Sequence, residues 1–104
     1  MNKELNYWAR PAIKLEQNTE YIIEQVCNHY GITEIQLRSR CRIRKFVDAR
    51  NVLMYIFKIN LRMTYQDIGA MFNKHHATII HAINKVENLK DFDSDFKELI
   101  NRFV

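Results

Sequence analysis

The sequence predicts an all-α fold of about five to six helices, arranged around one long central helix. Three observations lead to this expectation. Apolar residues recur at intervals of three and four from residue 19 onward, as they do on one face of a helix. Nowhere do four or more residues alternate cleanly between apolar and polar, as they would in a half-buried strand. The 104 residues include only two glycines and one proline, too few for the turns of a β-sandwich.

A chain of 104 residues corresponds to about one domain. We predict an N-terminal arm over residues 1–18, which lacks clear periodicity, followed by a helical domain over residues 19–104. The arm contains the only tryptophan, Trp8, with Tyr7 beside it, and both rings are expected to pack on the domain. Because the sequence starts with Met1, we expect a natural short protein rather than a cut fragment.

The first two helices are predicted from their caps. Asn18 or Thr19 is expected to cap the first, and Gly31 fits the left-handed position that ends it. Thr33 and Gln36 have the spacing of a capping box, which predicts a short second helix. The apolar positions of the first helix are Ile22, Ile23, Val26, Cys27 and Tyr30.

The stretch from Phe46 to Leu61 is apolar on nearly every side, which predicts a central helix covered by the others. Thr64 and Asp67 have capping spacing and open another short helix. Gly69 costs about 1 kcal/mol inside a helix relative to alanine, so its presence indicates a neighbouring backbone that comes close. The inward residues of this short helix are Ile68, Met71 and Phe72.

Asn73 and Lys74 form a tight break, after which a helix is expected from about His75 to Leu89. The segment from Asp91 to Ser94 is predicted to be a turn and cap before a last helix. The apolar faces of these two helices are Ile79, Ala82, Ile83 and Val86, and Phe96, Leu99, Ile100 and Phe103. The polar face of the longer helix carries Lys74, Thr78, His81, Lys85 and Asn88.

Composition and charge narrow the class of protein. Sixteen basic residues against twelve acidic ones give a net charge of +4, a mild preference for polyanionic partners. Two cysteines are too few for a disulfide scaffold. No apolar run approaches the roughly 20 residues that cross a bilayer, and the N-terminus does not resemble a signal peptide. We therefore expect a cytoplasmic protein without a membrane partner.

Two features together favour DNA binding. Five of the eight residues from Arg38 to Lys45 are basic and none is acidic, so this run can neutralise phosphates or send one arginine into the minor groove. Further along, a short helix, a tight turn and a helix with a partly basic face follow one another. The first residues of such a helix can reach base edges in the major groove.

Residues 64–82 read Thr-Tyr-Gln-Asp-Ile-Gly-Ala-Met-Phe-Asn-Lys-His-His-Ala-Thr-Ile-Ile-His-Ala. This segment resembles the signature of the C-terminal DNA-binding domain of the bacterial replication initiator DnaA, and the similarity covers about residues 19–103. Upstream, Leu37–Arg40, Ala49-Arg50 and Met54-Tyr55 are similar to the family's basic loop and long helix. The resemblance implies a helix-turn-helix of the tryptophan-repressor type. It also implies sequence-specific binding to a duplex DnaA box, in replication initiation or its regulation.

The resemblance also implies site residues. By position, Arg42 is similar to the arginine that enters the minor groove, and His76 to the histidine that hydrogen-bonds a base edge. The residues expected to contact bases are Arg42, His75, His76, Ala77 and Thr78. The residues expected to contact the DNA backbone are Arg40, Arg44, Arg50, Lys58, Thr64, Tyr65, Lys74, His81 and Lys85, with a structural or phosphate-side role for His81.

The sequence departs from the family pattern at three points. His75 stands where the family has Asp, which suits a hydrogen bond from a cytosine amino group. Ala77 stands where the family has its first Thr, and it keeps the methyl group but loses the hydroxyl. The turn before His75 is one residue shorter than the family's. We therefore expect DNA binding with an altered preferred site.

Other functions are weighed and set aside. With only Gly31 and Gly69, the chain cannot form the phosphate loop of the family's nucleotide-binding domain, so no nucleotide, cofactor or enzymatic activity is expected. His76 and His81 are five residues apart, which does not favour a metal site on one helix face. The alternatives are a helical protein-interaction module or a transcriptional regulator on the same fold, with RNA binding as a minor option. A replication-protein partner stays unidentified.

Overall fold

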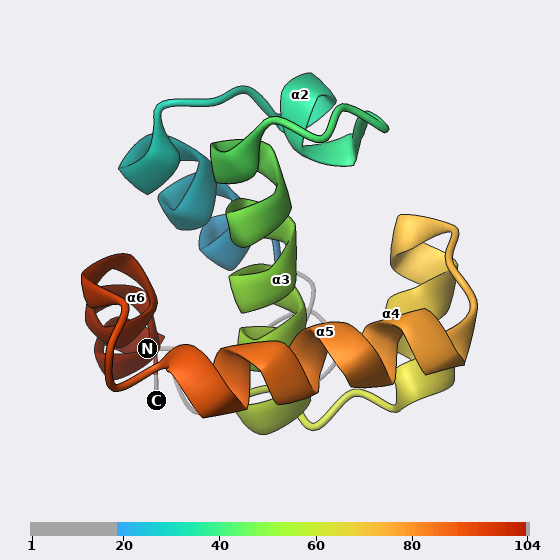
Figure 1. Cartoon of the computed structure of the whole chain (residues 1–104). Coiled ribbons are helices and arrows are strands. Elements are labelled where there is room, and N and C mark those ends of the chain that lie inside the picture. Colours follow the sequence, from blue (N-terminus) through green and yellow to red (C-terminus); the bar gives the residue numbers. More distant parts are fainter. Residues whose placement is uncertain (1–18, 104) are drawn as a thin grey trace, which may run out of the picture.

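The computed structural model describes residues 19–103, and these form six helices (Figure 1). The first described helix covers residues 19–30. It is followed by α2 (Glu34–Arg38), α3 (Arg44–Ile59), α4 (Tyr65–Phe72), α5 (His76–Leu89) and α6 (Ser94–Phe103). Within this range there is no strand, which confirms the all-α prediction. The arm with Tyr7 and Trp8, and the cap expected at Asn18, lie outside the described residues.

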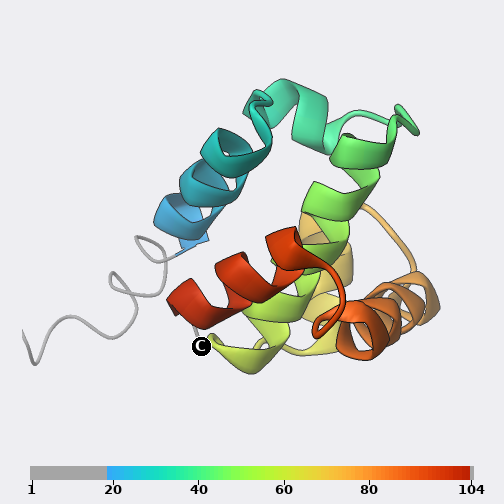
Figure 2. The same ribbon diagram turned by 60° about the vertical axis from the view of Figure 1, so that its left-hand side comes forward.

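Helix α3 is the centre of the domain, and α2, α4, α5 and α6 all contact it. Figures 1 and 2 show α3 running through the middle of the domain, with α6 and the first described helix on one side and α4 on the other. Nine of its sixteen residues are buried, as expected for a helix that is apolar on nearly every side. The helix begins two residues earlier than predicted, at Arg44, and ends two residues earlier, at Ile59.

The predicted caps define the shorter elements. Thr33 and Gln36 form both hydrogen bonds of a capping box, 3.1 and 2.9 Å long. The Thr64 hydroxyl accepts the Asp67 amide at 3.0 Å, and the Asp93 carboxylate accepts two amides at the start of α6. These short-range bonds fix where α2, α4 and α6 begin. Gly31 has a φ of +67°, as expected for the residue that ends the first helix.

The described helices share one apolar core. Every predicted inward position of α5 and α6 is buried or half-buried. Cys27 lies in this core as a small apolar side chain, and burial raises the pKa of its thiol. Within residues 19–103, no helix is both long and apolar enough to cross a membrane.

Candidate nucleic-acid interface

Helices α4 and α5 are joined by a very tight turn. Asn73 adopts the left-handed conformation, with a φ of 55°, and the Lys74 amide donates to the Gly69 carbonyl at 2.8 Å. A Cβ atom built on Gly69 would lie only 2.5 Å from the Lys74 carbonyl oxygen. The turn therefore requires the absence of a side chain at residue 69, which confirms the close backbone approach predicted there. This turn places the start of α5 directly against α4.

The first turn of α5 is exposed to solvent. His75 is its N-cap, and the His75 Nδ1 atom accepts the Ala77 amide at 3.1 Å. The His75 and His76 rings stack, with their centroids 4.3 Å apart and their planes 30° from parallel. Ala77 and Thr78 are also exposed. All four residues expected to contact bases from this helix are therefore accessible and adjacent.

The remainder of α5 is held by packing and by one polar cluster. Ile79, Ile83 and Val86 are buried against the core. Near the end of the helix, the Tyr55 hydroxyl of α3 donates to the Glu87 carboxylate at 2.8 Å. The hydrogen bond from Tyr55, and then that from Lys90, lower the pKa of Glu87, while burial raises the pKa of Tyr55. These contacts hold α5 on α3, so that its first turn projects from a fixed support.

The polar face predicted for α5 is observed as an exposed face. Thr78, His81, Lys85 and Asn88 are exposed along the helix, and Lys74 is exposed in the turn before it. His81 is therefore accessible to solvent rather than packed in the core. The cations Lys74 and Lys85 follow the three-and-four spacing of Thr78 and His81, so these four residues share one face.

The segment between α2 and α3, residues 39–43, is a basic loop. Arg40 and Arg42 are exposed in it, and neither forms an ion pair within the described part of the chain. At the start of α3, Arg44 pairs with Asp48 at 3.3 Å while its own side chain stays largely exposed. Ile43 supplies no side-chain cap to α3, so the amides of Arg44 and Lys45 at the start of that helix stay available to an anion.

Arg50, which the resemblance assigns to the DNA backbone, lies mostly inside the domain. Its side chain is 8% exposed, and its guanidinium is engaged by groups of the protein itself. The Arg50 Nε atom donates to the Leu37 carbonyl at 2.6 Å, and the Arg50 Nη2 atom donates to the Ser39 hydroxyl at 3.3 Å. Burial lowers the pKa of Arg50, although a guanidinium stays charged. Arg50 satisfies a carbonyl at the end of α2 and holds the first residue of the basic loop.

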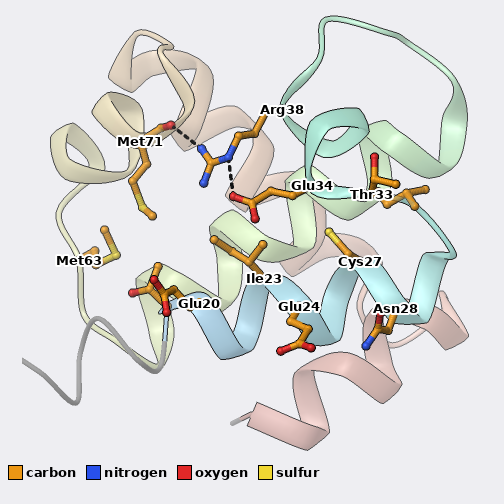
Figure 3. Close-up of a pocket in the computed structure, with 12 residues that line it drawn as sticks. Glu20, Ile23, Glu24, Cys27, Asn28, Thr33, Glu34, Arg38, Met63 and Met71 are labelled. Carbon is orange, nitrogen blue, oxygen red and sulfur yellow. Dashed lines mark hydrogen bonds and ion pairs between the residues drawn. The ribbon is translucent and has the colours of Figure 1, made fainter.

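The basic loop and the α4–α5 turn lie next to each other. Arg38 pairs with Glu34 at 3.0 Å and donates to the Met71 carbonyl at 3.3 Å, which ties α2 to the end of α4 (Figure 3). Figures 1 and 2 show the loop and the turn on the same side of α3. A cavity of about 270 Å³ separates them, lined by Leu37, Arg38, Ser39, Arg40, Arg50, Met71, Phe72, Asn73 and Lys74.

A further cluster of polar side chains lies between the end of α3 and the start of α4. Thr64 is exposed and caps α4, and Tyr65 is half-buried beside it. The Lys58 ammonium lies over the Tyr65 ring, 4.2 Å from its centroid. This cation–π contact keeps the lysine next to the first turn of α4. Lys58, Thr64 and Tyr65, all expected to contact the DNA backbone, thus form one local cluster.

Sequence reasoning missed two side chains that matter to this surface. Arg38 and Ser39 belong to the predicted basic run, but neither was assigned a function. The Ser39 hydroxyl donates to the Gln36 carbonyl at 2.7 Å and accepts the Cys41 amide at 3.3 Å. Ser39 thus shapes the loop from within, and Arg38 ties α2 to the end of α4. The only sequence signal is their place at the end of a capped short helix.

A second cavity has an acidic rather than a basic lining. It measures about 900 Å³ and lies between the first described helix, α2 and the segment around α4. Figure 3 shows the acidic side chains of Glu20, Glu24 and Glu34 in its lining, together with Ile23, Cys27, Met63 and Met71. These carboxylates would repel a phosphate, so this cavity does not belong to the basic surface. Residues 19–103 contain no group of three metal-ligating side chains.

Comparison with known proteins identifies this arrangement. A family model described as the bacterial DnaA protein helix-turn-helix matches residues 19–86. The chain is 38% identical over 77 residues to the chromosomal replication initiator protein DnaA of Desulfatibacillum aliphaticivorans, covering 74% of this chain and 17% of that protein. It is 39% identical over 83 residues to DnaA of Rickettsia bellii, covering 79% and 18%. DnaA of Sphingopyxis alaskensis is 35% identical over 88 residues, covering 84% and 18%.

The matches are confined to a small part of these relatives. The chain spans less than a fifth of the length of each of the three replication initiators. The matched family segment contains the basic loop, the tight turn and the exposed first turn of α5. The similarity therefore falls on the surface that the structure brings together.

Proposed function

The chain belongs to the bacterial DnaA helix-turn-helix family of DNA-binding domains, and from this premise we propose that it binds duplex DNA at a DnaA-box-like sequence. We assign it to replication initiation or its regulation, in the cytoplasm and on the nucleoid. Binding alone is the proposed activity, with no nucleotide, cofactor or chemical step. Transcriptional regulation on the same fold is the second role that this activity would serve.

The observation that supports this proposal most directly is the exposed first turn of α5, which lies near a basic loop whose exposed arginines have no acidic partner among the described residues. His75, His76, Ala77 and Thr78 are accessible at the end of a helix whose other face is buried. A helix placed in this way fits the major groove with its first residues at base edges. The basic loop, which carries Arg40 and Arg42, lies on the same side of α3 as the α4–α5 turn. Neither arginine has an acidic partner among the described residues.

The proposed contacts divide into three groups. Arg42 enters the minor groove from the basic loop, and the first-turn residues of α5 read the major groove. Around these base-contacting residues, phosphates are bound by exposed or half-buried side chains and by the uncapped start of α3. The proposed phosphate contacts are Arg40, Arg44, Lys58, Thr64, Tyr65, Lys74, His81 and Lys85. Arg50 is left out because it is buried.

Steep salt dependence is the first expected result. With about four to six phosphates contacted, log Kd plotted against log salt concentration should have a slope of about 4 to 5, since each contact releases close to one counterion. The measurement is a fluorescence-anisotropy titration of a DnaA-box duplex at several salt concentrations. A scrambled duplex of the same length and composition is the control and should bind more weakly. Equal binding of the two duplexes contradicts sequence specificity, and a flat salt response favours the protein-interaction alternative.

Two alanine substitutions should distinguish residues that contact bases from residues that contact phosphates. His76→Ala is expected to cost roughly 1–3 kcal/mol on the preferred duplex and little on the scrambled one, because it removes a base contact. Lys58→Ala is expected to weaken both duplexes by the same factor, because it removes a contact to phosphate. Both variants are titrated against both duplexes.

Lys97→Ala is the matched control for charge. Lys97 is exposed on α6, on the side of the domain away from the basic loop and α4, and its loss changes the net charge as Lys58→Ala does. It should leave both affinities nearly unchanged. Unaltered discrimination in His76→Ala contradicts the reading role of His76. An effect of Lys97→Ala as large as that of Lys58→Ala contradicts a local contact at Lys58.

A further inference from the structure

His75 is held in one orientation by two contacts. Its Nδ1 atom accepts the backbone amide of Ala77 at 3.1 Å, which makes the side chain the cap of α5. The ring also stacks on His76, with 4.3 Å between the centroids. His75 is exposed, so the edge of the ring opposite Nδ1 is accessible. The histidine is therefore an ordered group at the very start of the helix.

The capping bond fixes the position of the ring proton. A neutral imidazole has one nitrogen that accepts a hydrogen bond and one that donates. Because Nδ1 accepts the Ala77 amide, the proton of the neutral ring is on Nε2. The only polar atom that His75 can present outward is therefore a donor. An aspartate at this position would cap the helix equally well but would present an acceptor.

We propose that His75 is a specificity-determining residue that selects a hydrogen-bond acceptor on the major-groove edge, guanine before all others. Guanine offers two acceptors there, N7 and O6, whereas cytosine offers an amino donor that would oppose the Nε2 proton. The proposal rests on the proposed function, because it names the base class read by the same interface. It predicts that, at one position of the preferred site, guanine stands on the strand where an aspartate would select cytosine.

Two substitutions isolate the polarity of this one group. His75→Asn keeps an oxygen that can cap Ala77 and presents an amide donor outward. His75→Asp keeps the cap and presents an acceptor. Both residues are favourable helix caps, so the start of α5 is retained in each variant. Thermal unfolding of the free variants verifies that the domain is folded before binding is compared.

The test is a base-pair scan with the full chain. Every position of a DnaA-box duplex is replaced in turn by the other three pairs, and affinities are measured for the original chain and both variants. The original chain and His75→Asn should prefer the same pair at one position. His75→Asp should prefer a different pair there by about tenfold, and no other position should change. Nitrogen NMR of the free chain should show the His75 proton on Nε2.

The possible failures are distinguishable. If all three proteins discriminate strongly among duplexes but have identical preferences, His75 does not select the base, and the proposed function still stands. A His75 proton found on Nδ1 likewise overturns the inference alone. If the original chain prefers no duplex over a scrambled one, both the proposed function and this inference are wrong.

Discussion

Replacing Gly69 with alanine is expected to destabilise the domain by about 1–3 kcal/mol, the usual cost of forcing an extra methyl group into a packed site. The added Cβ would lie 2.5 Å from the Lys74 carbonyl oxygen, which is backbone and can move only if the α4–α5 turn opens. The same movement should displace His75 and His76 from their place beside α4. Urea unfolding measures the loss of stability, and titration of folded protein with a DnaA-box duplex measures the loss of affinity.

The sign of the effect makes this prediction decisive. At an unobstructed helix position, glycine to alanine would raise stability by about 1 kcal/mol through helix propensity. A higher unfolding midpoint for Gly69→Ala would therefore contradict the close approach. The matched control is Gln66→Ala, an exposed position of the same helix, which should leave stability within about 0.5 kcal/mol. Only Gly69→Ala should impair DNA binding through the geometry of the turn.

Most helices of the domain could be predicted because their determinants are local. The capping pairs Thr33–Gln36 and Thr64–Asp67 lie three residues apart, and the structure forms the predicted bond in each. The inward faces of α5 and α6 follow directly from helical spacing. Even the close approach at Gly69 was predictable, since an unfavourable glycine inside a helix needs a reason.

The start of α3 was predicted two residues late for a physical reason. Arg44 and Lys45 form its first turn, although cations are unfavourable near the positive end of a helix dipole. Because both residues are polar, they also do not contribute to the apolar repeat from which the helix was predicted. The ion pair between Arg44 and Asp48, one turn on, supports the helix there. The start of α3 could therefore not be located from apolar spacing alone, because its first residues are charged.

The candidate site was only partly predictable, because several of its determinants are contacts between distant residues. The bond from Arg38 to the Met71 carbonyl joins positions 33 apart in sequence. The cap that His75 gives to Ala77 is local, but histidine is not among the favoured capping residues. A resemblance can mark a basic position as functional, yet it cannot show whether that side chain points toward DNA or into the domain.

Arg50 is an example, and its substitution is the second change for which we expect a large loss of stability. Arg50→Met should lower stability by about 2–3 kcal/mol, because the variant loses charged hydrogen bonds to Leu37 and Ser39 and leaves a carbonyl without its donor. DNA affinity should fall as well, since the basic loop that carries Arg40 and Arg42 loses its support. Urea unfolding and duplex titration measure the two effects.

Substitution by lysine separates a positioning role from a direct phosphate contact. If Arg50 held a phosphate, Arg50→Lys would keep most of the affinity, because the charge is retained. If it positions the loop, lysine cannot reproduce the two separate donor directions, and Arg50→Lys should lose nearly as much stability as Arg50→Met. Arg40→Lys, on the exposed part of the loop, should leave stability unchanged. A stable Arg50→Lys variant that keeps its affinity and salt slope, beside an Arg50→Met variant with a lowered salt slope, would return Arg50 to the DNA-contacting surface.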